Sequence, residues 1–405
     1  MLPPSGGSTK HMNRGVRVLV ASLVLIAVAT GFFIGGVVFA GVLKTVPSID
    51  SLTSSTTDPG TLLDTVDSLI RQRALVPSSE ASITNNAIRG ALESLGDPYA
   101  AYYDAQQFAE LQQTQSGEFF GVGVSLGLNK SGQPVAVTVF DNTPAKRAGI
   151  KGGDVFTAVN GVRKPVWVLD DFVKIVRGAA GTTVTVEVSR NGTKPFTVTL
   201  TRERIAVPNT ITKMYGTVGY VRLMTFNELS AADLAKAIKE FDAKGAKGYI
   251  LDLRENPGGL LDSAVKVSSI FINSGVIVRV DERGKPESVE NAAGGALTTK
   301  PLVVLVDAYS ASASEIVAGA LKDYGRATIV GVTTYGKGSV QTVLPIGNGG
   351  AVKMTIAHYL TPQSKVINKV GVLPDVVVKM DPKLQASEKT DIQLARALEV
   401  LRSKL

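Results

Sequence analysis

The sequence predicts a multidomain α/β protein with one membrane segment near its N-terminus. Three observations support this prediction. The chain has 405 residues, more than one domain usually contains. Short alternating strand patterns fill residues 115–205, and apolar strands alternate with helical patterns over 206–385. An uncharged apolar run covers residues 18–43.

Composition narrows the chemistry that the chain can perform. Apolar residues make up 44% and charged residues 19%, a balance that supports packed cores and excludes a largely disordered chain. There is no cysteine, so disulfides, thiolate zinc sites and cysteine nucleophiles are excluded. The two histidines are His11, which precedes the apolar run, and His358, which lies in a Tyr-Leu-Thr-Pro context that looks structural. A catalytic base other than histidine is therefore expected.

The net charge is +8, from 43 basic and 35 acidic residues. The basic residues are spread thinly, and no basic block is interleaved with aromatic residues. A solvated basic surface is therefore favoured over a nucleic-acid site, and no nucleic-acid partner is expected.

The run from Val18 to Leu43 predicts a membrane anchor. A spanning helix needs about 20 apolar residues, whereas the core of a signal peptide has about 7–15. The length favours an uncleaved anchor, although small residues near Ala40 leave a cleaved signal open, and a buried soluble helix is the remaining alternative. Arg14 and Arg17 place residues 1–17 in the cytoplasm by the positive-inside rule. The rest of the chain is then expected outside the cytoplasm, tied to the cell membrane by this single pass.

The segments after the anchor follow in order. Residues 44–114 read as a linker followed by helical patterns near 62–70, 83–92 and 105–113. Strands are expected at 119–127, 134–140, 154–160, 182–188 and 195–201, with one helix near 168–177. The α/β domain should have strands at 217–223, 249–253, 302–306 and 327–332, and helices at 231–244, 260–270 and 313–323. An amphipathic pattern from Ile392 to Leu401 predicts a helix within residues 386–405.

Three motifs in the α/β domain offer chemistry. Asp252 to Gly259 runs from a strand into a Pro-Gly-Gly turn, whose backbone N–H groups can hold an oxyanion; an ordinary turn is the alternative. Ser310 to Glu315 places serines where a strand meets a helix, although Ser312 and Glu315 also fit a helix capping box.

The third motif is Tyr335 to Gln341, in which Lys337 lies between glycines. If this segment is extended, Lys337, Ser339 and Gln341 share one face. Burial lowers the pKa of a lysine, and the neutral amine can then act as general base towards a serine. The alternative is a surface lysine in a hairpin turn. Together with the shortage of usable histidine, the motifs indicate a Ser–Lys dyad.

These residues resemble the carboxyl-terminal processing (tail-specific) protease family, serine peptidases with a PDZ domain and a Ser–Lys pair. The matching blocks are Asp97-Pro98-Tyr99, Gly117 to Gly123, Pro144 to Asp154, Asp252 to Gly259, Ser310 to Glu315, Gly336 to Gln341 and Gly371 to Asp375. The resemblance implies a crotonase-like α/β protease core over 206–385 and an inserted PDZ domain over 115–205.

The resemblance also implies the roles of the site residues. Ser312 would be the nucleophile, and Lys337, which follows 25 positions later, would be its base. Gln341 would orient the lysine, and Glu315 would have a supporting role. The backbone N–H groups of Gly258 and Ala313 would form the oxyanion hole. The PDZ carboxylate loop would consist of Phe120, Gly121, Val122 and Gly123.

The function implied is that of an extracytoplasmic serine endopeptidase that works through an acyl-enzyme and selects protein substrates by their C-terminal tails. No cofactor or metal is implied. Two alternatives remain: a catalytically idle PDZ scaffold, and a crotonase-type enzyme acting on acyl thioesters. An intact Ser312, Lys337 and Gln341 argue against the scaffold, and the PDZ module and the anchor favour a polypeptide substrate.

Overall fold

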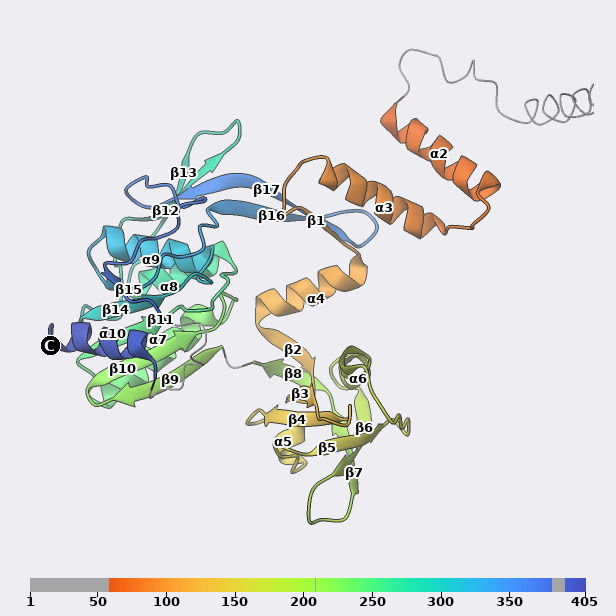
Figure 1. The fold of residues 1–405 in the computed structure, drawn as a ribbon, viewed down its shortest axis with the longest axis horizontal. Helices are drawn as coiled ribbons and strands as arrows, with labels where there is room; N and C mark the ends of the chain where they lie inside the picture. Colours follow the sequence, from red (N-terminus) through yellow and green to blue (C-terminus); the bar gives the residue numbers. More distant parts are fainter. Residues whose placement is uncertain (1–57, 208, 381–389) are drawn as a thin grey trace, which may run out of the picture. The chain divides into compact units, whose positions relative to one another are not determined.

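The computed structural model describes residues 58–207, 209–380 and 390–405, which form two compact units divided between Asn86 and Ala87 (Figure 1). The predicted anchor at 18–43 lies outside the described residues. Within the ranges that are described, no helix combines the length and the apolar character needed to cross a bilayer.

The helices predicted after the linker are present. They are α2 (Pro59–Arg73), α3 (Glu80–Glu93) and α4 (Ala105–Ser116). Helix α2 begins where Asp58 accepts the N–H of Thr61, with Pro59 in the first turn. Helix α4 begins with a capping box between Asp104 and Gln107, and it ends at Gly117, whose φ of 73° suits a left-handed cap.

Two sheets make up residues 115–205, where a PDZ domain is predicted. Strand β2 (Glu118–Gly121) pairs with β8 (Glu203–Ala206), and a five-stranded antiparallel sheet has the order β3-β4-β5-β6-β7. Its strands are β3 (Val124–Leu128), β4 (Pro134–Val139), β5 (Val155–Val159), β6 (Thr183–Ser189) and β7 (Phe196–Thr201), and its helices are α5 (Pro144–Arg147) and α6 (Leu169–Val176). Trp167 and Phe172 pack edge to face in its core.

The strand predicted at 119–127 is in fact two strands. Val122 and Gly123 separate β2 from β3, and Gly123 has a φ of 84°. A Cβ at Gly123 would lie 2.2 Å from the Cβ of Thr143, so only glycine fits this break. An apolar run alone does not reveal such a break.

The α/β domain is built on a six-stranded sheet of order β18-β15-β14-β11-β10-β9, in which β9 is antiparallel and the others are parallel. Its strands are β9 (Thr210–Tyr215), β10 (Val218–Leu223), β11 (Gly248–Asp252), β14 (Leu302–Val306), β15 (Thr328–Gly331) and β18 (Val376–Val377). Its helices are α7 (Ser230–Ala243), α8 (Leu261–Ser269), α9 (Ala313–Asp323) and α10 (Ile392–Arg402).

Helices cover both faces of this sheet. The apolar sides of α7, α8 and α9 pack with Val221, Leu251 and Val304 in the largest core cluster. Helix α10 packs on alternate strand residues such as Ile250 and Val303, which face the other way. Because both faces are covered, the strands β11 and β14 are buried along their whole length, which explains the continuous apolar sequence of β14 and the apolar run Tyr249 to Leu251 of β11.

The sequence patterns do not predict a second, five-stranded sheet. It has the order β1-β17-β12-β13, with β16 paired to β17. Its strands are β1 (Ala101–Tyr103), β12 (Val276–Glu282), β13 (Ser288–Asn291), β16 (Ser339–Pro345) and β17 (Ala351–Leu360). Strand β13 is exposed throughout, and β16 and β17 are largely half-buried, so their sequences lack a clean apolar alternation.

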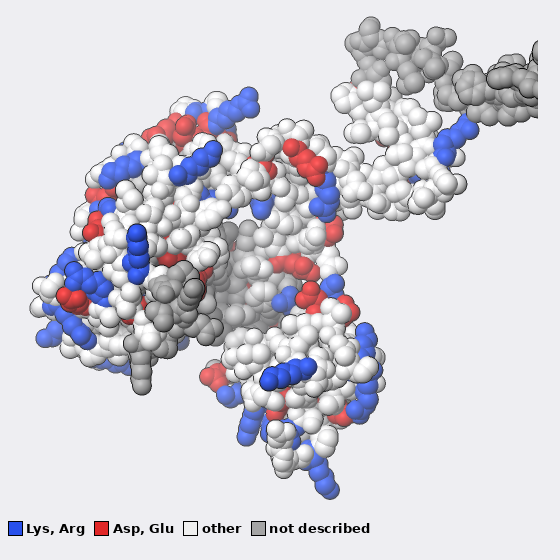
Figure 2. All heavy atoms as spheres, in the orientation of Figure 1, with Lys and Arg blue, Asp and Glu red and all other residues white. Residues whose placement is uncertain are grey.

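On the face seen in Figure 2, basic side chains are interspersed with acidic ones, which agrees with a thinly spread positive charge.

Candidate active site

The predicted catalytic segments leave the same edge of the six-stranded sheet. Strands β11, β14 and β15 are parallel neighbours that end at Asp252, Val306 and Gly331. The segments that follow them are 253–260, 307–312 and 332–338. Because the carboxyl ends of parallel strands share one edge, the three motifs lie together where ligands of open α/β sheets bind.

Ser312 occupies a strained turn between β14 and α9. Its φ of 56° and ψ of −113° are unusual for a residue with a Cβ, and its side chain is buried. The neighbouring serines serve the fold: the Ser310 hydroxyl donates to the carbonyl of Leu253 at 2.8 Å, and the Ser314 hydroxyl donates to the carbonyl of Asn256 at 2.9 Å. Of the three serines of the motif, the strained position belongs to Ser312.

Glu315 joins the serine turn to the lysine turn. Its carboxylate is fully buried and accepts the backbone N–H of Ser312 at 2.8 Å. The same carboxylate accepts the N–H of Lys337 at 2.9 Å and that of Gly336 at 2.7 Å. One side chain therefore fixes both predicted catalytic segments, a role that a capping box alone does not require.

Lys337 lies just before β16, and its side chain is half-buried. Burial lowers the pKa of Lys337, and the charge of Lys353 lowers it further, while Asp97 and Glu315 oppose the shift. The Nζ atom lies 4.5 Å from the ring centroid of Tyr99. Among the described residues, it forms no hydrogen bond with Ser312 or Gln341.

The Gln341 side chain has other partners. Its Nε2 donates to the hydroxyl of Ser339 at 2.8 Å and lies 3.4 Å from that of Thr355. Sequence alternation placed Lys337, Ser339 and Gln341 on one face. In the structure, however, β16 begins only at Ser339, so the shared face includes Ser339 and Gln341 but not Lys337. The pairing of β16 with β17 also shifts its register after Val340.

Gly258 lies directly beside the serine turn. A Cβ added to Gly258 would be 2.8 Å from the Cβ of Ser312 and 2.9 Å from the backbone nitrogen of Ala313. The φ of Gly258 is 97°, a second reason for glycine at this position. The two predicted oxyanion donors thus belong to adjoining segments. The N–H of Gly258 itself donates to the side-chain oxygen of Asn256 at 2.9 Å.

Asn256 is a supporting residue that the sequence reasoning did not single out. It is fully buried, and its side-chain nitrogen donates to the carbonyl of Leu223 at 2.9 Å. Its own carbonyl accepts the N–H of Ala311 at 3.1 Å. Its position next to the Pro-Gly-Gly turn could have indicated this role, but its partners Leu223 and Ala311 lie in β10 and in the turn before α9, far from it in the sequence.

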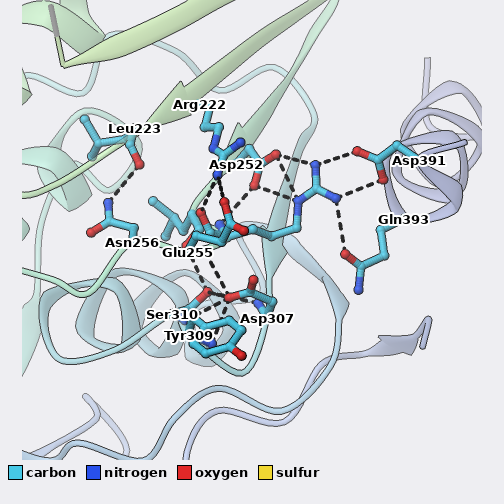
Figure 3. A network of polar contacts seen from close by, with 12 residues as sticks. Arg222, Leu223, Asp252, Glu255, Asn256, Asp307, Tyr309, Ser310, Asp391 and Gln393 are labelled. Atoms are coloured by element: carbon cyan, nitrogen blue, oxygen red, sulfur yellow. Dashed lines mark hydrogen bonds and ion pairs between the residues drawn. The ribbon is translucent and has the colours of Figure 1, made fainter. Parts of the chain in front are cut away.

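A buried ion cluster supports the turn that follows β11 (Figure 3). The Arg254 guanidinium donates to Asp252 at 2.6 Å, to Asp391 at 2.8 Å and to Gln393 at 3.2 Å. Asp391 and Gln393 lie at the start of α10, so the cluster joins that helix to the end of β11. Sequence reasoning also missed this cluster, because its members are far apart along the chain.

The predicted carboxylate loop lines a groove of about 310 Å³. All four residues, Phe120 to Gly123, contribute to it, together with Val173 and Val176 of α6. Arg177 adds a positive charge to the lining, and its guanidinium lies 4.9 Å from the ring centroid of Phe119. Strand β3 is the edge strand of its sheet and borders the same groove.

Comparison with known proteins gives a consistent result. The sequence model of peptidase family S41 matches residues 217–378, and a PDZ domain model matches residues 135–190. The chain is 40% identical over 317 residues to a carboxy-terminal-processing protease of Bartonella bacilliformis, covering 76% of this chain and 73% of that protein. It is 37% identical over 329 residues to a carboxyl-terminal-processing protease of Synechocystis sp., covering 78% and 77%.

Among solved structures, a photosystem II D1 C-terminal processing protease is similar, with 29% identity and a TM-score of 0.49 over 83% of this chain and 96% of that chain. The two sequence relatives are covered over more than two thirds of their length, and both family models fall on the regions described above. The chain therefore belongs to the carboxyl-terminal processing protease family, serine-type peptidases of family S41 that carry a PDZ domain.

Proposed function

We propose that this peptidase works through a Ser–Lys dyad of Ser312 and Lys337, and that it selects protein substrates by their C-terminal tails. The observation that carries the proposal is the buried Glu315 carboxylate, which accepts the N–H groups of both residues. A fold that only needed a helix cap would have no reason to fasten a lysine turn to the same carboxylate.

The chemistry follows from this arrangement. The neutral amine of Lys337 takes the proton of the Ser312 hydroxyl while the hydroxyl oxygen attacks the peptide carbonyl. The tetrahedral intermediate collapses to an ester on Ser312, the leaving amine takes the proton from Lys337, and water then hydrolyses the ester. Burial lowers the pKa of Lys337, which raises the fraction of neutral amine. The N–H groups of Gly258 and Ala313 would stabilise the oxyanion. For this, the N–H of Gly258 would leave the side-chain oxygen of Asn256 and donate to the oxyanion instead.

The PDZ groove supports selection by the substrate's tail. An extended peptide could add to the edge of β3, with its terminal carboxylate at the loop from Phe120 to Gly123. Val173 and Val176 on the opposite wall suit an apolar terminal side chain. We therefore expect free, apolar C-termini to be the preferred ligands.

An extracytoplasmic position is part of the proposal. It rests on the uncharged run 18–43 and on Arg14 and Arg17 before it. Alkaline phosphatase, which folds only outside the cytoplasm, should be active when fused after residue 60. An inactive phosphatase fusion together with a fluorescent green fluorescent protein fusion at the same site would reject this location.

The dyad is tested with casein and with a protein that ends in an apolar tail. Wild type should cleave both, and Ser312→Ala should cleave neither while it melts close to wild type. Loss of a helix cap alone would cost about 0.5–2 kcal/mol of stability and leave the rate intact. Full activity with a lowered melting temperature in Ser312→Ala would therefore reject the nucleophile. A wild type that hydrolyses acyl thioesters but neither protein would favour the crotonase-type alternative, and one that hydrolyses nothing would favour the scaffold.

A further inference from the structure

Tyr99 lies in a short loop that is fastened to the sheet carrying the lysine. The loop connects α3 to β1, and within it the N–H of Tyr99 donates to Asp97 at 2.9 Å. The other carboxylate oxygen of Asp97 accepts the N–H of Thr355 on β17 at 2.8 Å. Asp97 thus sets the position of Tyr99 relative to β17, the strand that pairs with β16.

The Tyr99 ring is a contact of the Lys337 amine. The Nζ atom lies 4.5 Å from the ring centroid and, among the described residues, is bonded to neither Ser312 nor Gln341. An aromatic face attracts an ammonium ion through its quadrupole, whereas a neutral amine gains little from it. The contact therefore stabilises one protonation state of Lys337 over the other.

The charged groups around Lys337 come from three further elements. Lys353 on β17 disfavours the ammonium, and Asp97 in the loop and Glu315 on α9 favour it. Burial, together with the neighbouring phenol of Tyr335, raises the pKa of Tyr99, whereas burial lowers the pKa of Lys337, and these opposite shifts favour a neutral Tyr99 ring while the lysine is protonated. The ring thus acts on Lys337 as a neutral π surface and not as a phenolate.

We propose that Tyr99 is a positioning residue that holds the protonated side chain of Lys337 on its ring, away from Ser312, and releases it when the amine loses its proton. The inference rests on the proposed role of Lys337 as the base. Under this arrangement, deprotonation does two things at once. It makes the amine a base, and it removes the attraction that keeps the amine from the serine.

Two substitutions at Tyr99 test the ring. Tyr99→Leu keeps an apolar side chain but removes the π face, and Tyr99→Phe keeps the ring. In Tyr99→Leu, the acid limb of kcat/KM should move to lower pH by roughly half a unit to one unit. At pH values below this limb, kcat/KM of Tyr99→Leu, divided by its own maximum at high pH, should then be about three- to ten-fold higher than the same ratio for wild type. In Tyr99→Phe, the limb should stay at the wild-type position.

Tyr103→Leu is the matched control, because the ring of Tyr103 lies 5.5 Å from Nζ of Lys353 in the same sheet. Its limb should stay at the wild-type pH. A limb that does not move in Tyr99→Leu, with a rate lowered equally at every pH, would reduce Tyr99 to a packing residue. A shift of the same size in Tyr99→Phe would assign the effect to the hydroxyl and overturn the role of the ring.

A measurement without turnover separates this inference from the proposed function. The Lys337 side-chain signal can be titrated by NMR in the Ser312→Ala protein with ¹³C-labelled lysine, and Lys337→Arg identifies the signal. Adding Tyr99→Leu should lower the titration midpoint, and adding Tyr99→Phe should not. Activity that survives in Lys337→Ala would reject the dyad, while the titration would still report the ring contact. An essential Lys337 whose midpoint does not respond to Tyr99→Leu would reject the ring contact alone.

Discussion

Glu315 on α9 accepts the hydroxyl of Thr334 at 2.6 Å, so the helix that follows the proposed nucleophile is bonded to the segment that leads to the proposed base. Thr334 in turn accepts the N–H of Val372 at 2.7 Å. The site is therefore supported by a chain of buried polar contacts that crosses three segments.

Glu315→Gln should lower stability and activity together. The two carboxylate oxygens accept four donors: the hydroxyl of Thr334 and the backbone N–H groups of Ser312, Gly336 and Lys337. A glutamine would turn an NH₂ group towards two of them, and each unpaired buried donor costs about 1–3 kcal/mol. Urea unfolding and casein cleavage should both show the loss, unlike in Ser312→Ala, where stability is kept. A Gln variant with wild-type stability and rate would contradict the linking role.

Lys337→Arg should lose nearly as much activity as Lys337→Ala. Arginine keeps the charge but stays protonated, so it cannot take the serine proton. The wild-type rate should rise with pH through the lowered pKa of the lysine. Substantial cleavage by the arginine variant would reduce Lys337 to a positional role.

Lys337→Met should be inactive and more stable than wild type at neutral pH. Because the pKa of Lys337 is lowered on folding, the folded state binds fewer protons than the unfolded state, and wild-type stability rises with pH between the lowered value and the ordinary value of 10.5. Methionine removes the cost of the buried charge, so the advantage of the variant should shrink as the pH rises through this interval. Thermal melts across this range check the sign, and an advantage that does not change with pH would assign the gain to packing.

Asp391→Asn should loosen α10. Burial acts against it, but hydrogen bonds from Arg254 hold the pKa of Asp391 below its ordinary value of 3.8. Breaking a buried ion pair costs about 3–5 kcal/mol, so urea unfolding at pH 7 should show a loss in this range. The loss should narrow as the pH falls below 3.8, because the wild-type carboxylate then loses its own contribution. Asp262→Asn, in an exposed pair with Lys266, is the control and should change little.

Gly121→Asp should weaken the binding of tail peptides. A Cβ at Gly121 meets no atom within 4 Å, so a side chain fits and would reach into the groove that the residue lines. Its negative charge would repel a terminal carboxylate, and we expect a loss of about tenfold or more in affinity by titration calorimetry. Gly121→Ala is the matched control. Equal losses in both variants would point to backbone strain and not to charge.

The same groove tests a further hypothesis, that the PDZ domain over 115–205 acts as a gate on the protease core and not only as a tether for the substrate. We expect peptides with a free, apolar C-terminus to raise the rate at which a second substrate is cleaved, since a gate must bind its ligand differently in its two states. Deleting 115–205 should lower the cleavage of tail-bearing proteins more than that of short peptides. If the deletion lowers the cleavage of both substrates equally and free tails do not raise the rate, the PDZ domain is only a passive tether.

The sequence predicted the parts of the fold that are buried on both sides. Strand β14 is apolar and fully buried over Leu302–Val306, and its pattern is unambiguous. The second sheet was missed because burial there depends on neighbours that are remote in the chain. Strand β1, with three residues, owes its existence to pairing with β17.

The site could be predicted as motifs but not as contacts. The sequence predicted Ser312 where a strand meets a helix and Lys337 in a segment between glycines, and the sheet order brings the segments that follow β14 and β15 to one edge. Whether Gln341 meets Lys337 or Ser339 depends on where β16 begins and on its register shift, which no residue pattern shows. The bond from Glu315 to the lysine turn was likewise unpredictable, because it requires the relative position of α9 and the segment after β15.

The contact between Asp97 and Thr355 spans 258 positions of the chain. During synthesis, Asp97 leaves the ribosome long before the strand that holds its partner, and contacts between such distant residues form late. The loop that carries Tyr99 can therefore reach its place beside Lys337 only after β17 has been made. A nascent chain that already contains Ser312 and Lys337 therefore still lacks this contact, and the part of the site that is made first is among the last to reach its place.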